Sequence, residues 1–183
     1  NLLNDVWADI ERLGNIFQVD SVKALENLEA RVKIVAQKTQ GLSQTEKLPR
    51  VACIEWTDPL MVAANWIPEL VALAGGEPLF SNTGQASTQL KWESLIASNP
   101  DIIIFMPCGF DLNRTRLDAE LLSKRPEWQN LHANQTGRIY ITDGNAYFNR
   151  PGPRLVDSLE ILAEILHPEI FQYGYKGKSW DIF

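Results

Sequence analysis

The run DIIIFMP at residues 101–107 constrains the fold of this chain most. It places Ile102, Ile103 and Ile104 before Phe105 and Met106, with no polar residue between them. A strand that is apolar on both of its faces must be covered on both faces, which is typical of parallel sheets flanked by helices. The run therefore predicts an α/β fold in which helices protect a central sheet.

Further strands and helices alternate along the chain. Strands are predicted at RVACIEW (50–56), weakly at EPLF (77–80), and at RIYITDG (138–144). Helical spacing of apolar residues predicts helices at 58–76 (interrupted at Pro68), 88–100, 117–131 (broken at Pro126) and 153–169. The buried stripe of the last helix is expected to be Leu155, Leu159, Leu162 and Leu166. This strand–helix order predicts a parallel sheet.

Residues 1–40 predict two further helices. Helical spacing is followed by Leu3, Val6, Trp7, Ile10 and Leu13, and the helix is expected to end at Gly14. A second helix carries an apolar stripe from Val22 to Val35 and charged residues on its other faces. Its length of about twenty residues is long for a domain of this size. Residues 41–50 predict a polar, hinge-like linker.

Composition excludes several classes of protein. At 183 residues and 45% hydrophobic content the chain can bury a core, and its net charge of −6 argues against nucleic-acid binding. No apolar run is long enough to span a membrane. Cys53 and Cys108 are too few for a disulfide scaffold, and a bridge between neighbouring strands would be strained, so free thiols are expected. The chain opens at Asn1 without a signal peptide, so we expect a processed product or a piece of a longer protein.

Large contact-making side chains gather where the predicted strands end. Ligands of open parallel sheets bind beyond the carboxyl ends of the strands. Aromatic and amide side chains gather at these positions, together with one arginine and several turn-forming residues: Trp56, Asp58, Pro59, Ser81, Asn82, Pro107, Gly109, Phe110, Asn145, Tyr147, Phe148, Asn149 and Arg150. Broad apolar surfaces with a few orienting polar groups suit ligand binding.

The same positions lack the partners that catalysis requires. The sequence has no nucleophile elbow, phosphate-binding loop, dinucleotide fingerprint or zinc-binding HExxH motif. His167 is expected to cap the last helix, His132 to lie in a polar connection, and Asp58, Asp111 and Asp143 to act as helix caps or turn residues. We therefore expect no catalysis, no metal and no cofactor. Trp66, just before Pro68, is open to two interpretations, a pocket residue or a core residue beneath a kinked helix.

Three segments resemble a known family. Residues 50–80, 99–112 and 137–169 are together similar to the substrate-binding proteins of ABC importers for cobalamin and ferric siderophores, most of all the cobalamin-type branch. The resemblance implies two α/β lobes joined by one long helix, with the ligand between the lobes. Residues 1–17 would be the last helix of a missing N-terminal lobe, 18–49 the connecting helix and linker, and 50–183 the C-terminal lobe.

The resemblance also implies roles for individual residues. The ligand wall would comprise Trp56, Asp58, Pro59, Trp66, Ser87, Gly109, Phe110, Asn145, Tyr147, Phe148 and Arg150. Glu93 would meet arginines of a membrane permease. Arg150 pairing with Asp143 or Asp157 is the structural alternative. Without the other lobe, Leu3, Trp7 and their neighbours would be exposed and would favour self-association.

The implied function is transport without chemistry. The receptor would capture cobalamin as cargo, outside the cytoplasm (periplasmic, or attached through a lipid), and deliver it to permease subunits. The scarcity of basic groups, Arg150 being the clearest, favours a neutral corrinoid over an anionic ferric siderophore. A flavodoxin-like enzyme or regulatory domain using Asp58 and Asp111 is the alternative from another class, and it should bind Mg²⁺.

Overall fold

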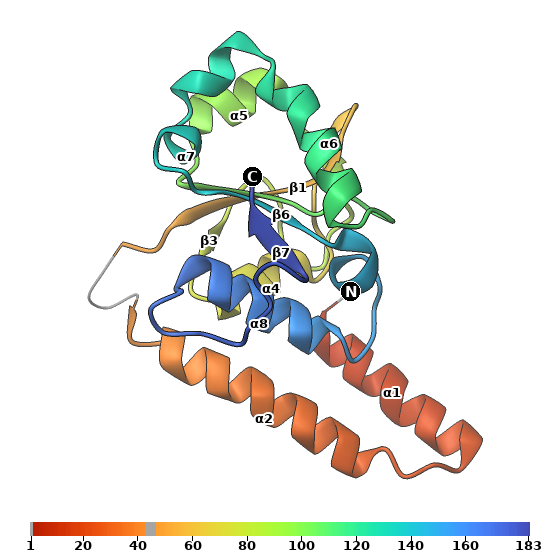
Figure 1. Cartoon of the computed structure of the whole chain (residues 1–183). Coiled ribbons are helices and arrows are strands. Elements are labelled where there is room, and N and C mark those ends of the chain that lie inside the picture. Colours follow the sequence, from red (N-terminus) through yellow and green to blue (C-terminus); the bar gives the residue numbers. More distant parts are fainter. Residues whose placement is uncertain (1, 43–46) are drawn as a thin grey trace.

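The computed structural model describes residues 2–42 and 47–183 and has three layers, with a helical hairpin outside them. In Figure 1 the sheet runs across the middle. Helices α5 (Trp92–Ser98), α6 (Leu112–Ser123) and α7 (His132–Gln135) cover one face, and α4 (Ile67–Leu73) and α8 (Leu155–Leu166) cover the other. The predicted α/β fold, a central sheet flanked by helices, is confirmed.

The sheet is parallel at its centre and antiparallel at both edges. Strands β3 (Glu77–Pro78), β1 (Arg50–Thr57), β5 (Ile102–Phe105) and β6 (Ile139–Thr142) run parallel. β2 (Leu60–Val62), β4 (Thr88–Gln89) and β7 (Trp180–Ile182) pair antiparallel at the margins. The expectation of a parallel sheet therefore holds only for the central strands.

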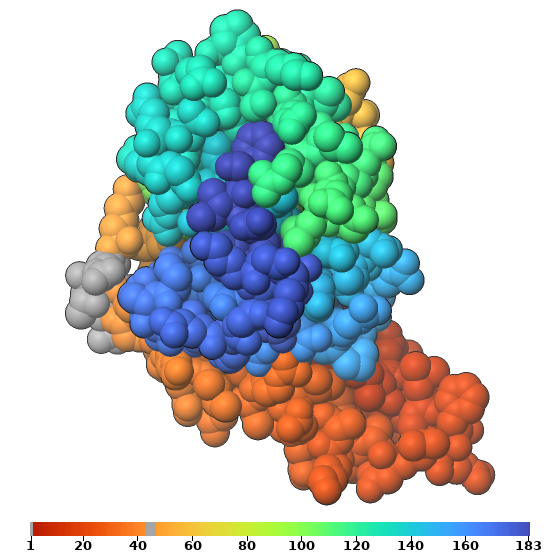
Figure 2. Space-filling view, in the orientation of Figure 1, coloured from red at the N-terminus to blue at the C-terminus, as the bar shows by residue number. Residues whose placement is uncertain are grey.

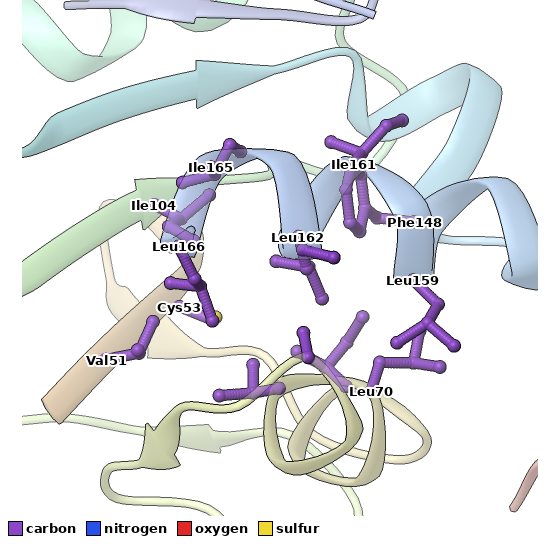
Figure 3. Packing of buried hydrophobic residues seen from close by; sticks show 14 of the residues in the cluster. Val51, Cys53, Leu70, Ile104, Phe148, Leu159, Ile161, Leu162, Ile165 and Leu166 are labelled. Carbon is purple, nitrogen blue, oxygen red and sulfur yellow. The ribbon is translucent and has the colours of Figure 1, made fainter. Parts of the chain in front are cut away.

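The predicted central strand and last helix form the larger core. Ile102 to Met106 are all fully buried. Figure 3 shows Leu159, Leu162 and Leu166 of α8 pointing toward the sheet and toward Leu70 of α4. Beyond the predicted stripe, almost every residue of α8 is buried, because the helix lies between the sheet and a further helix, α2.

A second core fills the opposite face of the sheet. Trp128, in the short 3₁₀ turn η1 (Pro126–Asn130), stacks parallel to Trp92 of α5 with 6.4 Å between ring centroids. Phe105 of β5 packs on Trp128 from the sheet side, with 6.2 Å between ring centroids. The break predicted at Pro126 is confirmed, because Pro126 opens this turn after α6 has ended.

The segment 58–76 was predicted as a helix kinked at Pro68, and that prediction is wrong. Its first part forms strand β2, which makes a hairpin with β1. Helix α4 begins only at Ile67, so Pro68 occupies the first turn, where its missing N–H costs nothing. The run LMVAA is apolar enough for either structure, and neighbouring strands decide between them.

The first two helices form a hairpin that extends beyond the lobe. Helix α1 (Leu3–Phe17) continues past the expected end at Gly14, and α2 (Val22–Thr39) packs on α8 and α4. Figure 2 shows the α1–α2 end, in red and orange, projecting away from the body of the molecule. Leu3 is buried and Trp7 is packed against the core, contrary to the expected exposure. Exposed apolar side chains gather instead at the projecting end, where they include Leu13, Ile16, Phe17, Val19 and Val22.

An ion-pair network fixes α2 to the lobe. Arg31 donates from Nε and Nη2 to both carboxylate oxygens of Glu160, at 2.8 and 2.6 Å, and from Nη2 to Asp157 at 2.6 Å. The hydroxyl of Tyr175 donates to Glu160 at 2.9 Å. Hydrogen bonds and opposite charges stabilise buried ions, and they raise the pKa of the Arg31 guanidinium above its ordinary value. The predicted linker at 41–50 falls partly on residues 43–46, outside the described residues.

Candidate functional site: the carboxyl edge of the sheet

Two aromatic side chains form the centre of the carboxyl edge. Trp56, near the end of β1, and Phe110, in the loop after β5, lie 5.2 Å apart between ring centroids and are tilted by 43°. Both rings are partly exposed. The indole Nε1 of Trp56 donates to the carbonyl of Asp58 at 3.0 Å, which fixes the ring against its own turn. The two rings together form an apolar surface, and the Trp56 ring has little freedom to move.

The loop after β6 continues this surface. The N–H of Asn145 donates to the carbonyl of Phe110 at 3.2 Å, and Arg150 donates from Nη2 to the side-chain oxygen of Asn145 at 2.9 Å. The structural alternative for Arg150, a pairing with Asp143 or Asp157, does not occur among the described residues, because Asp157 binds Arg31 and Asp143 accepts from the N–H of Ala146. Arg150 is exposed beside this amide.

A single π-helical turn, η2 (Gly144–Phe148), holds that loop close to the sheet. Gly144 lies so near the carbonyl of Pro107 that a Cβ at this position would clash with it. The side chain of Asn149 donates to the carbonyls of Met106 and Gly144 at 3.1 and 2.9 Å. Such π-turns often occur at functional sites. Here the turn sets Asn145 beside Phe110.

Two of the predicted contact rings do not join the Trp56–Phe110 pair. Phe148 is buried in the core with 1% of its surface exposed. Tyr147 packs on the same core, away from the Trp56–Phe110 pair. Its ring contacts that of Tyr175 edge-on, with 6.2 Å between ring centroids. The sequence could not separate these residues from their neighbours, because both follow a strand and both are aromatic.

Trp66 is both a core residue and a pocket residue, the two interpretations that the sequence left open. It packs against the core, its Nε1 donates to the carbonyl of Phe148 at 2.9 Å, and its side chain lines a small cavity of about 110 Å³. The other lining residues are Glu55, Ala64, Asn65, Ile67, Cys108, Phe148 and Asn149. Ser87, a predicted contact residue, donates from Oγ to the carboxylate of Glu55 at 2.5 Å.

The remaining predicted residues lie near this edge or outside it. Asp58, Pro59 and Gly109 are exposed at the ends of β1 and β5. Glu93 is exposed in the first turn of α5, on the helical layer rather than the strand-end loops. Glu55 is the site residue that sequence reasoning missed, although its position one residue before Trp56 was a usable signal.

Within residues 2–42 and 47–183, no cluster of three or more His, Cys, Asp or Glu residues is arranged to hold a metal ion. Asp111 caps α6 by accepting from the N–H of Arg114, as predicted for a structural carboxylate. Cys53 and Cys108 are both free thiols, as predicted, and burial raises the pKa of Cys53 to about 12.

A larger hollow of about 410 Å³ lies at the opposite, amino edge of the strands. Asp101, Arg138, His132 and His167 line it. His167 caps α8, as predicted, and its Nε2 lies 3.0 Å from the carbonyl of Gly75. Leu42 and Lys47 also border the hollow, and they flank residues 43–46, outside the described part of the chain. The contact residues of the carboxyl edge do not reach it.

Comparison with known proteins agrees with this architecture. Residues 9–146 match the family model described as periplasmic binding protein. The chain belongs to the periplasmic binding protein family. A curated relative of this binding protein, the uncharacterized ABC transporter substrate-binding lipoprotein YvrC of Bacillus subtilis (strain 168), is 30% identical over 92% of the chain. The chain spans about half of that relative, 52% of its length.

Solved structures share the fold of this binding protein at lower identity. A periplasmic heme binding protein from Pseudomonas aeruginosa matches with a TM-score of 0.75 at 21% identity, over 92% of this chain and 61% of that one. The periplasmic vitamin B12 binding protein BtuF of Vibrio cholerae matches with a TM-score of 0.68 at 19% identity, over 91% and 62%. In the binding protein described here, no helix within 2–42 or 47–183 is both long and apolar enough to cross a bilayer.

Proposed function

We propose that the chain is one lobe and the connecting helix of a substrate-binding receptor that serves an ABC importer. Residues 50–183 are the C-terminal lobe, α2 within 18–49 is the connecting helix, and residues 1–17 are the last helix of an N-terminal lobe. The ligand lies between the lobes, against the carboxyl edge. The Trp56–Phe110 pair carries the proposal, because two ordered, partly exposed rings at this edge form a wall for a large ligand.

The proposed ligand is a corrinoid. Its broad apolar macrocycle suits the tilted rings, and its peripheral amides suit Asn145 and Arg150. Two cations belong to this edge: Arg114 lies over Phe110 at 4.7 Å from the centroid, and Arg150 binds Asn145. A highly anionic ferric siderophore would call for more positive charge. The relatives whose names state a ligand include both vitamin B12 and heme binders, so heme belongs in the same test.

The proposed receptor acts outside the cytoplasm and has permease subunits as partners. The curated relative is named a substrate-binding lipoprotein of an ABC transporter, which supports this location. Glu93, exposed on α5, is the proposed contact with permease arginines. Exposed ion pairs contribute little affinity, so this contact would set orientation and encounter rate.

Calorimetric titration tests the proposal. Cyanocobalamin, hemin and a ferric hydroxamate are titrated separately into the whole receptor, this chain together with its N-terminal lobe. We expect one-to-one binding of cyanocobalamin, weakened about tenfold or more by Trp56→Ala and by Phe110→Ala. Tyr173→Ala, which removes an exposed ring outside the strand-end loops, is the matched control and should bind normally.

The three ligands separate the outcomes. Binding of hemin or the hydroxamate alone would keep the receptor role and overturn the corrinoid. Equal weakening by Tyr173→Ala would show that the aromatic pair is not the wall. Absence of binding for all three ligands would overturn the proposed ligand class.

A further inference from the structure

Glu55 lies at a β-bulge in β1, where this strand pairs with β2. Ile54 of β1 pairs with Val62 of β2, but Trp56 pairs with Met61, so two steps along β1 correspond to one step along β2. The extra residue is Glu55. Bulges are frequent next to active sites, where they redirect a side chain out of the regular alternation. Ile54 is also the last residue of β1 paired with β5, so Glu55 lies just beyond the parallel pairing.

The redirected carboxylate borders the small cavity. Glu55 lines the hollow of about 110 Å³ with Asn65, Trp66 and Cys108, and it is partly buried. Ser87 donates to Oε2 at 2.5 Å. In residues 2–42 and 47–183, Oε1 has no hydrogen-bond donor and the carboxylate has no ion-pair partner. The cavity is too small for a whole cofactor-sized ligand, so it can hold only a peripheral group.

A partly buried carboxylate with a free oxygen discriminates between ligand groups by their hydrogen-bonding capacity and their charge. It accepts hydrogen bonds from N–H or O–H groups, and bonds to a charged acceptor are stronger than neutral ones. A second carboxylate in the same hollow would place two like charges together. The small polar side chains around it, Asn65 and Cys108, bring no positive charge that would offset this repulsion.

We propose that Glu55 is a specificity-determining residue of the receptor, which accepts a peripheral carboxamide N–H of the ligand and rejects the corresponding carboxylate. The inference rests on the proposed function and deepens it, because it selects corrinoids that keep their amide side chains. It assigns selectivity to a residue of the sheet, whereas the aromatic pair supplies contact area.

The test compares cyanocobalamin with its singly hydrolysed derivatives, in each of which one peripheral amide is a carboxylate. Affinities are measured calorimetrically with the whole receptor. The variants are Glu55→Gln, whose side-chain amide offers a donor as well as an acceptor, and Glu120→Gln as control, an exposed glutamate on α6. Thermal unfolding checks that both variants are folded.

The expected result is selectivity that depends on residue 55. The unsubstituted receptor should bind cyanocobalamin at least about tenfold more tightly than one of the acids. Glu55→Gln should reduce that ratio to about threefold or less, whereas Glu120→Gln should retain it. Tight corrinoid binding with no selectivity, or selectivity unchanged in Glu55→Gln, would overturn the inference and leave the proposed function standing. No corrinoid binding at all would overturn the inference and the corrinoid as ligand, whereas the receptor role would still be decided by the hemin and hydroxamate titrations.

Discussion

The indole of Trp66 donates a hydrogen bond of 2.9 Å to the main-chain carbonyl of Phe148, across 82 residues of sequence. This bond joins the start of α4 to the end of η2. Both residues also line the small cavity beside Glu55. The geometry of the cavity therefore depends on a contact between two loops that the chain brings together only when the sheet is complete.

Trp66→Phe should lower the free energy of unfolding by about 1 kcal/mol, because it removes this hydrogen bond and leaves the Phe148 carbonyl without its donor. Urea denaturation measures the change. Trp7→Phe is the control, since Trp7 packs on the same core without a side-chain hydrogen bond among the described residues. An equal loss in both variants would assign the effect to ring volume.

Phe148→Ala should lower the free energy of unfolding by about 3–5 kcal/mol, because a fully buried ring leaves a cavity when it is removed. Any loss of ligand binding in this variant would then follow from a loosened core. Chemical denaturation measures the stability, and Phe148→Leu should cost less. Unchanged stability together with lost ligand affinity would return Phe148 to the ligand wall.

The two thiols should react differently. Cys108 is exposed, whereas Cys53 is buried and burial raises its pKa to about 12, so little thiolate forms at neutral pH. Mass spectrometry after alkylation should find Cys108 modified in the folded chain and both cysteines modified after denaturation. Bound ligand should slow the labelling of Cys108, which lines the cavity. Rapid native labelling of Cys53 would contradict the buried position.

Alkaline pH should destabilise the fold through Tyr175. Burial, the hydrogen bond to Glu160 and nearby carboxylates raise the pKa of its hydroxyl in the folded chain. The unfolded chain therefore releases this proton first, and stability falls as pH rises above the ordinary tyrosine pKa of about 10. Denaturation between pH 8 and about 11 measures the slope, which Tyr175→Phe should reduce. An identical slope would exclude Tyr175 as the source.

Glu93→Arg should spare ligand binding and lower uptake, because the exposed side chain lies on α5 rather than on the strand-end loops. Calorimetry measures the first effect and a transport assay in reconstituted vesicles the second. Glu120→Arg, an equal change of charge on α6, should leave both unaffected. Uptake that is unchanged in Glu93→Arg would reject the proposed docking role.

Residues with a strong local signal were predicted correctly. The run from Ile102 to Met106 and the apolar repeat of α8 predicted a covered sheet and a buried helix, since burial on both faces leaves few other solutions. The strand-end rule also located Trp56, Phe110 and Asn145 at one edge. These inferences needed only chain order and hydrophobic pattern.

Features that depend on neighbouring elements were not predictable. The hairpin strand β2 was mistaken for helix because its apolar run is short, and pairing with β1 decides its conformation. The burial of Phe148 depends on the π-turn, and the reach of Glu55 depends on a bulge whose position is set by the partner strand. Tertiary contacts, rather than local preference, fix all three.

The attachment of Arg31 to α8 has a mechanical consequence. Tilting α2 against the lobe would separate the guanidinium from Glu160, which is 7% exposed, and an unpaired buried charge is costly. The helix therefore behaves as a stiff strut that turns together with the sheet. A force applied at the exposed end of α2, near Val22, would rotate the whole lobe rather than change the angle between α2 and α8.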